Sequence, residues 1–523
     1  MEFLLNGAQM RACDTATIKT FGVPSLVLME RAALACADAL CDEDFDLSRT
    51  LVVCGSGNNG GDGFAIARIL WERGLQPEIF PAGREENMTE DGKIQKKICE
   101  NYGITFCRNP EMAEYTCIVD ALFGVGLCRE ITGNYREWIE KINESPARVL
   151  AVDIPSGIHA DNGRVMGCAV RADVTVTFAF RKIGHVMYPG AEYAGKVIRK
   201  PIGITAASLS QPPAVQAVTE EVRSWMPARL ENSNKGTYGK ALIAAGTRNM
   251  SGAAFMASKA AYRTGTGLVR ILTEESNRIC LQTLLPEAIL DTLQTETEAA
   301  APLERDSYTA LEAVHWAGAV CIGPGYGTWP WKKELLIQML HHLRTPLVLD
   351  ADGLNLIAEE PEILENVSAP VILTPHPGEM ARLLHCTIPE VTEDPIRVCR
   401  EFARKYRVIC ILKGARTVIS DGPEAWINET GNDGMATGGS GDVLAGIITG
   451  FLAQGCAPLA AAILGVYIHG LAGDLAREQS GARGMLAGEI IEALPEILKE
   501  SCGTASGRDR ADRTGKNSFP EEE

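Results

Sequence analysis

The sequence predicts an α/β protein built from two domains, each a largely parallel sheet covered by helices. The chain has 523 residues, whereas single cores stop growing at about 250–300 residues. Two long stretches alternate short β-branched runs with helical patterns, which is typical of parallel sheets with helices on their faces. Glycine-rich or polar segments directly follow several of the β-branched runs, at the sheet edge where open α/β sheets bind ligands.

The composition indicates a soluble globular protein whose partners are small molecules. Hydrophobic residues make up 46% of the chain, charged residues 22%, and the formal net charge is −17. There is no run of about 18 apolar residues, so no membrane-spanning helix is expected, and the first residues do not form a secretory signal. So acidic a surface repels nucleic acid, although backbone dipoles can still bind a small phosphorylated ligand. Sixteen cysteines without C-x-x-C pairs favour reduced thiols in the cytoplasm over a zinc site.

The first alternating stretch covers residues 51–204 and follows a segment, residues 9–41, that is expected to be helical. A buried strand at residues 51–54 is followed by glycines and then by a helix whose apolar positions run from Phe64 to Trp71. Three later β-branched runs each end near a polar residue and are expected to be strands: residues 116–120, 148–153 and 173–178. Residues 1–212 are therefore expected to form the first domain.

A change of composition near residues 206–219, where small residues precede two prolines, marks the domain boundary. We place a linker at residues 213–221, the second domain at residues 222–502, and a polar tail that is expected to be disordered at residues 503–523. In the second domain, strands are expected at residues 240–245, 319–322, 346–349, 371–373 and 408–412, with helices at residues 253–264 and 442–453 among others.

A glycine-rich run in the second domain, residues 438–441, leads directly into Asp442. Glycines let successive backbone N–H groups converge on one point, and a helix starting near Asp442 adds the positive end of its dipole. The run therefore predicts a phosphate site. A carboxylate beside phosphate makes sense if Asp442 takes the proton of a hydroxyl that meets the phosphate. The alternative interpretation is a plain helix N-cap.

Other strand ends of the second domain carry groups that suit a nucleotide. Residues 413–417, K-G-A-R-T, offer a cation, a close backbone approach and a hydroxyl, although Lys413 alone could be a solvated strand end. In residues 374–379, T-P-H-P-G-E, two prolines hold His376 rigidly, which suits either a ligand contact or a structural turn. Residues 323–327, G-P-G-Y-G, follow a third strand. All lie outside the carboxyl ends of predicted strands.

These motifs, with residues 350–355 and 235–240, resemble the ribokinase-like domain of the NAD(P)H-hydrate dehydratases over residues 222–500. The specific feature is T-P-H-P-G-E, K-G-A-R-T and A-T-G-G-S-G-D in this order, whereas G-x-G-D alone would indicate only a ribokinase-like fold. The resemblance implies a C-terminal ribokinase-like α/β domain that uses ADP or ATP with magnesium. It also implies a hydrate site of Ala253, Gly325, His376 and Asp442, and a nucleotide site of Lys413, Gly414, Ala415, Arg416, Thr417 and Gly441.

A second glycine-rich segment, residues 55–63, joins the first strand of the first domain to a helix. Five glycines in nine residues exceed the needs of a structural turn, so the segment predicts a phosphate or ribose site at a helix start. Asn59, Asp120 and Ser156 supply oxygen ligands of the kind a hard cation prefers. Asp153, at the end of the next predicted strand, is then the better candidate acid/base. Each aspartate alone could instead be a helix N-cap.

The first half resembles the NAD(P)H-hydrate epimerase domain, also called the YjeF N-terminal domain, over residues 1–212. The motifs N-N-G-G-D-G, D-A-L-F-G-V-G-L and D-I-P-S-G all match. The resemblance implies a Rossmann-like three-layer α/β/α fold, potassium held by Asn59, Asp120 and Ser156, and Asp153 in contact with the hydrated ring. Lys182 matches a recurring family lysine to which no role is assigned. The implied dinucleotide site is Asn58, Asn59, Gly60, Gly61, Asp62, Gly124, Val125, Gly126, Leu127, Cys128, Arg129, Glu130 and Asp153.

Fusion of the two domains resembles the bifunctional NAD(P)H-hydrate repair family. In that chemistry, water adds to the nicotinamide ring of NADH or NADPH and gives R and S hydrates, NADHX and NADPHX. The first domain interconverts the epimers, and the second dehydrates the S epimer with ADP or ATP, Asp442 deprotonating the ring hydroxyl. The resemblance also implies a homo-oligomer. Two alternatives remain open: the second half is a small-molecule kinase, or the first half is a regulatory nucleotide-binding module.

Overall fold

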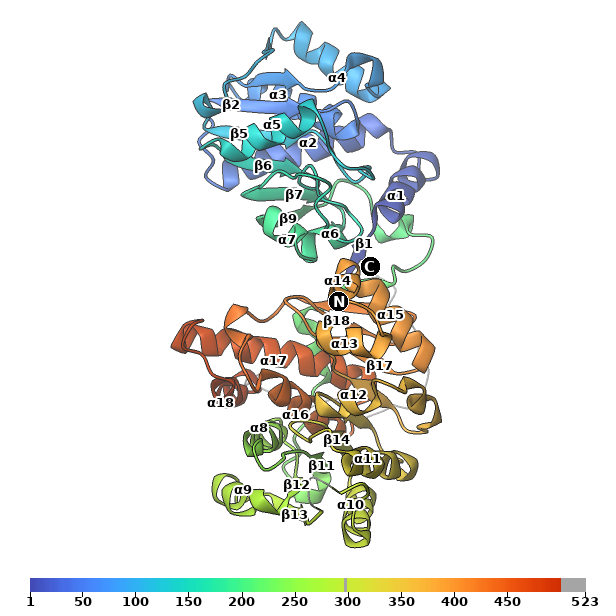
Figure 1. The fold of residues 1–523 in the computed structure, drawn as a ribbon. Helices are drawn as coiled ribbons and strands as arrows, with labels where there is room; N and C mark the ends of the chain where they lie inside the picture. Colours follow the sequence, from blue (N-terminus) through green and yellow to red (C-terminus); the bar gives the residue numbers. More distant parts are fainter. Residues whose placement is uncertain (296–298, 500–523) are drawn as a thin grey trace.

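The computed structural model describes residues 1–295 and 299–499, so the tail expected at residues 503–523 lies outside the described residues. The chain forms two α/β lobes (Figure 1). The first lobe is built on a seven-stranded sheet and the second on a twelve-stranded sheet. The predicted fold class of two sheet-based domains is confirmed.

The sheet of the first domain is entirely parallel, in the order β4-β3-β2-β5-β6-β7-β9. Its inner strands are fully buried because helices cover both faces, α2 and α3 on one and α5 on the other. The three strands expected after β2 match β5, β6 and β7 to within one residue at each end. The strands are β2 Thr50–Cys54, β3 Glu78–Pro81, β4 Thr105–Phe106, β5 Cys117–Ala121, β6 Arg148–Val152, β7 Val174–Phe178 and β9 Lys196–Lys200.

The helical segment expected at residues 9–41 is two helices. Gly22, with φ of +76°, and Pro24 break it, because neither residue continues a helix. The helices of the first domain are α1 Gly7–Lys19, α2 Ser25–Asp42, α3 Asn58–Glu72, α4 Glu90–Asn101, α5 Asn134–Glu144, α6 Ile183–Val186 and α7 Gly190–Tyr193.

The second sheet has the order β13-β12-β11-β14-β15-β16-β17-β18-β19-β10-β1-β8, with a parallel core from β13 to β17. The five strands expected here match β11, β14, β15, β16 and β17, whereas β12, β13, β18 and β19 were not predicted. The bounds are β11 Lys240–Ala244, β12 Leu268–Glu274, β13 Ile289–Leu293, β14 Ala319–Ile322, β15 Leu347–Leu349, β16 Val371–Leu373, β17 Ile409–Leu412, β18 Thr417–Ser420 and β19 Ala425–Asn428.

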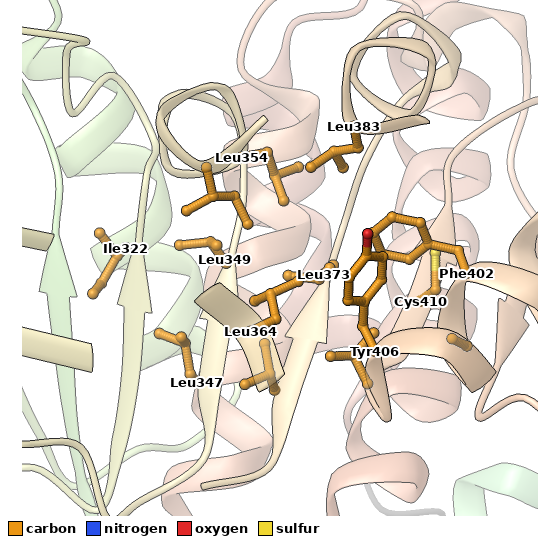
Figure 2. Close-up of a cluster of buried hydrophobic side chains, with 14 of the residues drawn as sticks. Ile322, Leu347, Leu349, Leu354, Leu364, Leu373, Leu383, Phe402, Tyr406 and Cys410 are labelled. Carbon is orange, nitrogen blue, oxygen red and sulfur yellow. The ribbon is translucent and has the colours of Figure 1, made fainter. Parts of the chain in front are cut away.

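Helices cover both faces of this sheet and fix the positions of its strand ends. One face packs against α8, α16, α17 and α18, the other against α10 to α13 and α15. In Figure 2, side chains of neighbouring strands meet those of the covering helices: Ile322, Leu347, Leu349, Leu373, Leu354, Leu383 and Phe402. The helices are α8 Ser251–Arg263, α9 Arg278–Leu284, α10 Glu304–Trp316, α11 Pro330–His342, α12 Asp352–Ile357, α13 Pro377–Leu384, α14 Ile388–Glu393, α15 Pro395–Tyr406, α16 Ser440–Ala453, α17 Pro458–Ser480 and α18 Ala487–Ile497.

The helix α17 is long and apolar enough to cross a membrane by length and composition, and within the described residues it is the one helix that meets that test. Of its most apolar window, 72% is buried inside the protein, which is the pattern of a core helix.

The expected linker at residues 213–221 is wrong as a free connection. It contains β10, Val215–Ala217, which pairs in parallel with β19 and antiparallel with β1, Glu2–Leu5. β1 pairs in turn with β8, Arg181–Lys182, so strands from the first 212 residues complete the sheet of the second domain. Strands of two to four residues are too short to stand out in a hydrophobic pattern, because their pairing partners are distant in the sequence.

Candidate active sites

The first domain contains a cavity of about 550 Å³ at the carboxyl ends of its strands. Its walls come from α1 and α2, the start of α3, the loop after β5, and the ends of β6, β7 and β8. A cavity of this size accommodates a small ligand of nucleotide dimensions.

The glycine-rich segment at residues 55–63 is not a loop throughout, because α3 already begins at Asn58. Asn58, Asn59 and Asp62 line the cavity, whereas Gly60 and Gly61 do not. A Cβ atom at Gly60 would lie 1.9 Å from the carbonyl oxygen of Gly55, and one at Gly61 would lie 2.6 Å from a methyl group of Met29. These two glycines therefore let α3 pack closely, and they place the amides of its first turn beside the cavity.

Asp120 and Ser156 form a buried oxygen cluster behind the cavity, with Asn59 close by. Asp120 accepts hydrogen bonds from the hydroxyl (2.6 Å) and the backbone N–H (2.8 Å) of Ser156. Burial raises the pKa of Asp120 to about 6, partly offset by these hydrogen bonds. The amide nitrogen of Asn59 is buried with no hydrogen-bond partner, and a Cβ atom at Gly124 would lie 3.2 Å from its amide oxygen. Among the residues described, no group of three or more His, Cys, Asp and Glu side chains could hold a metal.

Asp153 is held from several directions at the end of β6. Its φ of +67° is unusual for a residue with a side chain, and no helix follows, so the N-cap interpretation is wrong here. Lys182, whose side chain is fully buried, forms an ion pair with the Oδ1 atom of Asp153. The hydroxyl of Thr177 and the N–H of Phe178 donate to the same oxygen at 3.2 Å. No role for Lys182 follows from the sequence motifs, and the structure places it against the candidate acid/base.

His185 anchors the backbone of the same pair. Its Nδ1 atom accepts the N–H of Lys182 at 3.0 Å, and its Nε2 atom lies 2.9 Å from the carbonyl oxygen of Asp153. Burial, followed by the charge of Lys182, lowers the pKa of His185 to about 3, so the ring is neutral. A neutral ring that accepts at Nδ1 must donate from Nε2, which fixes the Asp153 carbonyl.

Two further carboxyl groups face the cavity. Burial, with the nearby Asp153, raises the pKa of Asp14 on α1 to about 6 and that of Asp62 well above its ordinary value. Asp14 was missed by the sequence analysis because it lies in a helix with no motif around it. In the loop after β5, Gly124, Val125, Gly126, Leu127, Cys128 and Arg129 line the cavity, whereas Glu130 does not.

In the second domain, four neighbouring strands end at one place. Gly323, Asp350, Thr374 and Lys413 directly follow β14, β15, β16 and β17. The ammonium group of Lys413 lies 2.8 Å from Asp350 and 3.8 Å from Glu379, and Thr374 donates to Asp350 at 2.7 Å. Burial opposes the charge of Lys413, but Asp350 and Glu379 together raise its pKa above the ordinary value. Lys413 is thus a fixed cation and not a solvated strand end.

The glycine run at residues 438–441 brings α16 to the same place. Gly439, with φ of +94°, is the N-cap, so Asp442 lies inside the first turn and is not the cap. A Cβ atom at Gly441 would lie 3.4 Å from the ammonium nitrogen of Lys413. Burial, and next the charge of Asp350, raises the pKa of Asp442 to about 7. A carboxyl group that titrates near neutral pH beside unpaired helix amides suits proton transfer next to a phosphate.

Comparisons with known proteins match both halves of the chain. Residues 241–496 match the family model described as NAD(P)H-hydrate dehydratase, and residues 25–184 match that of the YjeF-related protein N-terminus. A bifunctional NAD(P)H-hydrate repair enzyme of Moorella thermoacetica is 37% identical over 95% of this chain and 97% of its own length. The chain belongs to the bifunctional NAD(P)H-hydrate repair family. The first domain is its epimerase domain and the second its dehydratase domain.

Other proteins that are similar to this chain carry the same or a related description. The bifunctional NAD(P)H-hydrate repair enzyme of Escherichia coli is 35% identical, covering 94% of this chain and 92% of its own. Among solved structures, an ADP/ATP-dependent NAD(P)H-hydrate dehydratase of Bacillus subtilis, co-crystallized with ATP/Mg²⁺, is 33% identical, with a TM-score of 0.47. It covers 53% of this chain and 96% of its own.

The remaining predicted residues of the dehydratase domain are Ala253, Gly325 and His376, and they lie in two different surroundings. Ala253 and Gly325 are neighbours, since a Cβ atom at Gly325 would lie 3.1 Å from that of Ala253. His376 is the N-cap of α13 and accepts the N–H of Gly378 at 3.0 Å, with half of its side chain exposed. This capping role is the structural turn that the sequence left open, and the Nε2 atom of the ring lies 3.4 Å from the Glu379 carboxylate.

The nucleotide segment at residues 413–417 forms a turn whose arginine contacts the epimerase domain. Gly414 and Ala415 form the turn between β17 and β18, and the Thr417 hydroxyl donates to the Gly414 carbonyl at 3.3 Å. The Arg416 guanidinium donates from Nε to the carbonyl oxygen of Val186 in the epimerase domain at 3.1 Å, and from one Nη atom to the carbonyl oxygens of Ala415 and Glu429 at 3.2 and 3.4 Å. Arg416 therefore links this turn to the epimerase domain. The sequence could not show this, since the partner lies 230 residues away.

Proposed function

We propose that this chain epimerises R- and S-NAD(P)HX and dehydrates S-NAD(P)HX to NAD(P)H at the expense of ADP or ATP. The observation that carries the proposal is that one chain holds two separate carboxylate sites, each beside a helix N-terminus: Asp153 with Lys182, and Asp442 with Lys413. Both NADHX and NADPHX are proposed as substrates, because the family descriptions do not separate them.

In the epimerase domain, Asp153 is proposed to move a proton to and from the hydrated ring. Interconverting two epimers requires a bond at the hydroxyl-bearing carbon to break and to re-form on the other face. Asp153 is rigidly held through its Oδ1 atom and its backbone carbonyl, so its second oxygen can be presented to the ring in one geometry. The loop Gly124 to Arg129 and the start of α3 would bind the dinucleotide.

In the dehydratase domain, Asp442 is proposed to take the proton of the ring hydroxyl, whose oxygen then attacks the terminal phosphoryl group of ADP or ATP and releases AMP or ADP. Phosphate is a better leaving group than hydroxide, so it departs from its ring carbon as a proton leaves the neighbouring carbon, which restores the ring double bond and releases inorganic phosphate. Amides at the start of α16 and the ammonium group of Lys413 stabilise the charge on the transferred phosphoryl. Magnesium arriving with the nucleotide would be held by the carboxylates of Asp350 and Asp352, whose charges act on Asp442, and would offset the negative charge of the phosphates.

The S epimer alone, with ADP or ATP, tests this proposal against the kinase alternative. We expect NADH absorbance and inorganic phosphate to appear in equal amounts. A stable phosphorylated product with no NADH would instead support a small-molecule kinase. Exchange of the two epimers in the absence of ADP and ATP would exclude the alternative in which the epimerase domain is only a regulatory module.

Potassium is proposed to bind at Asn59, Asp120 and Ser156. The site fits a cation because Asp120 is fully buried and receives hydrogen bonds only from neutral donors, the hydroxyl and N–H of Ser156 and the N–H of Leu122. Bound there, potassium would supply the positive charge that Asp120 lacks and fix the loop that begins at Phe123, whose N–H donates to Ser156.

Potassium is therefore expected to raise the melting temperature of the wild-type protein relative to sodium at equal ionic strength. The Asp120→Asn variant should melt at the same temperature in the two salts. Its epimerisation should require about tenfold more potassium than that of the wild type, or more. Thermal unfolding in matched salts measures the first effect without reference to activity. An equal potassium shift in Asp120→Asn and wild type would contradict the site.

Dehydration should depend on pH through Asp442. Its pKa of about 7 means that the base is mostly protonated at pH 6 and mostly ionised at pH 8. We expect kcat/KM for the S epimer to rise about tenfold from pH 6 to pH 8 and then to level off. A profile that is flat across this range would contradict Asp442 as the base.

Cytoplasmic location and homo-oligomeric assembly are also proposed for this chain. The cysteines of the described residues are all free, as expected in a reducing compartment. The net charge of −17 disfavours nucleic acid and acidic membrane surfaces as partners. The oligomer rests on the family resemblance alone, and sedimentation of the purified chain would test it.

A further inference from the structure

One short segment, residues 181–188, connects the epimerase site to the dehydratase domain. It begins with β8, whose two residues pair with Leu4 and Leu5 of β1 at the end of the dehydratase sheet. Successive side chains of a strand point in opposite directions. Lys182 accordingly reaches Asp153 in the epimerase domain, while Arg181 reaches Glu429 at the end of β19 in the dehydratase domain.

Arg181 and Glu429 form a two-pronged ion pair between the domains. The guanidinium of Arg181 donates to the two carboxylate oxygens of Glu429 at 3.0 and 2.7 Å, and to Glu2 on β1 at 2.7 Å. The side chain of Arg181 is only 18% exposed and that of Glu429 29%. Paired, fork-like contacts of arginine with carboxylate restrict orientation as well as distance, and partial burial protects them from screening.

Arg416 holds the other end of the same segment. It donates from Nε to the carbonyl oxygen of Val186, the last residue of α6, and its guanidinium lies 5.0 Å from the centre of the Tyr188 ring. The helix α6 carries His185, which is bonded to both Lys182 and Asp153. Glu429 and Arg416, both from the dehydratase domain, thus fix the two ends of the segment that positions the Asp153 pair.

We propose that Glu429 and Arg416 are positioning residues of the epimerase site, acting through Lys182 and His185 on Asp153. The inference rests on the proposed function of Asp153. Neither residue lines the cavity, so neither is expected to contact the substrate. Because Lys182 is fully buried and Asp153 has an unusual backbone conformation, a small displacement of the segment must alter the carboxylate's geometry.

The test is Glu429→Gln in the full chain, which keeps the shape and removes the charge. We expect kcat for exchange of the two epimers, measured without nucleotide, to fall about tenfold while KM for the hydrate stays within twofold. Glu429→Asp should recover part of the loss. Dehydration of the S epimer should continue at the wild-type rate, which shows that the chain remains folded.

A matched control is available at a second ion pair between the domains. Arg164 and Glu393 are 53% and 57% exposed, and the hydrogen bonds of Arg164 go to Glu393, Asn162 and His159, outside residues 181–188. Glu393→Gln removes an inter-domain ion pair as well, and it should leave both activities unchanged. An equal loss of epimerisation in Glu393→Gln would mean that domain contact in general is responsible, and would overturn the specific role of Glu429.

The outcomes separate this inference from the proposed function. If the wild type epimerises and Glu429→Gln does so at the same rate, the positioning inference is overturned and the proposed function still stands. Absence of epimerisation in the wild type would overturn the function itself. If Glu429→Gln lost dehydration as well through misfolding, Arg416→Gln would decide, because it removes the bonds to the carbonyl oxygens of Val186 and Glu429 and leaves the ion pair of the Glu429 carboxylate with Arg181. Unchanged exchange kinetics in a folded Arg416→Gln chain would then overturn the inference.

Discussion

Asp442→Asn is expected to lower kcat for dehydration of the S epimer by about 10²–10⁴-fold, because the variant removes the general base and leaves the phosphate site in place. Epimer exchange should continue at the wild-type rate, since Asp153 lies in the other domain. The measurement is NADH formation from purified S epimer with ADP and with ATP. Substantial dehydration in this variant would contradict Asp442 as the base.

The same substitution should stabilise the folded chain at alkaline pH. The folded-state pKa of Asp442, about 7, is raised above its ordinary value, so the ionised group opposes folding. Between the two pKa values the folded state binds more protons, and stability declines as pH rises through this window. Asp442→Asn removes that penalty, so its melting temperature should exceed that of the wild type at pH 8 and match it more closely at pH 4.

A matched control lies nearby. Asp433 pairs with Arg477, has a 77% exposed side chain, and precedes the glycine run by a few residues. Asp433→Asn removes the same charge from the same region without touching Lys413 or Asp350. It should change neither dehydration nor its pH dependence. Loss of dehydration in the control would show that local charge or folding, and not proton transfer by Asp442, is responsible.

Asp153→Asn is expected to abolish epimer exchange, by about 10²–10⁴-fold, and to leave dehydration of the S epimer intact. Asparagine keeps an oxygen that can accept from Lys182, Thr177 and Phe178. Asp153→Ala should have the same catalytic effect, but it leaves Lys182 buried without a carboxylate, which costs about 3–5 kcal/mol. Exchange is measured by chromatographic separation of the epimers. Retained exchange would exclude Asp153, and loss of both activities would indicate misfolding or a shared site.

The local chemistry of both sites could be read from the sequence because it lies in contiguous motifs. Residues 438–442 and 58–62 each place glycines and an aspartate at a helix start, Asp120 lies near the end of the buried strand β5, and Asp153 directly follows β6. The helix boundaries were wrong by a few residues. Both helices begin inside their glycine runs, which shows that glycine there serves close packing as well as ligand approach.

What the sequence could not supply is the pairing of residues far apart in the chain. Lys182 meets Asp153 across 29 residues, and Lys413 meets Asp350 across 63. Arg416 illustrates the limit: the family resemblance places it in the nucleotide site, and its side chain also binds a carbonyl 230 residues away, which no local motif indicates. Such contacts depend on strand order in the sheets, and the short strands β1, β8 and β10 that set this order carry no periodic signal.

Recovery of NADH from a prepared mixture of both epimers tests most directly that one chain performs both reactions. With ADP or ATP and potassium, we expect absorbance at the NADH wavelength to return completely, because the R epimer is converted as the S epimer is consumed. Without ADP or ATP, no absorbance at this wavelength should return. Recovery that stalls at the fraction of S epimer initially present would contradict the epimerase activity, and recovery without nucleotide would contradict the phosphoryl-transfer route.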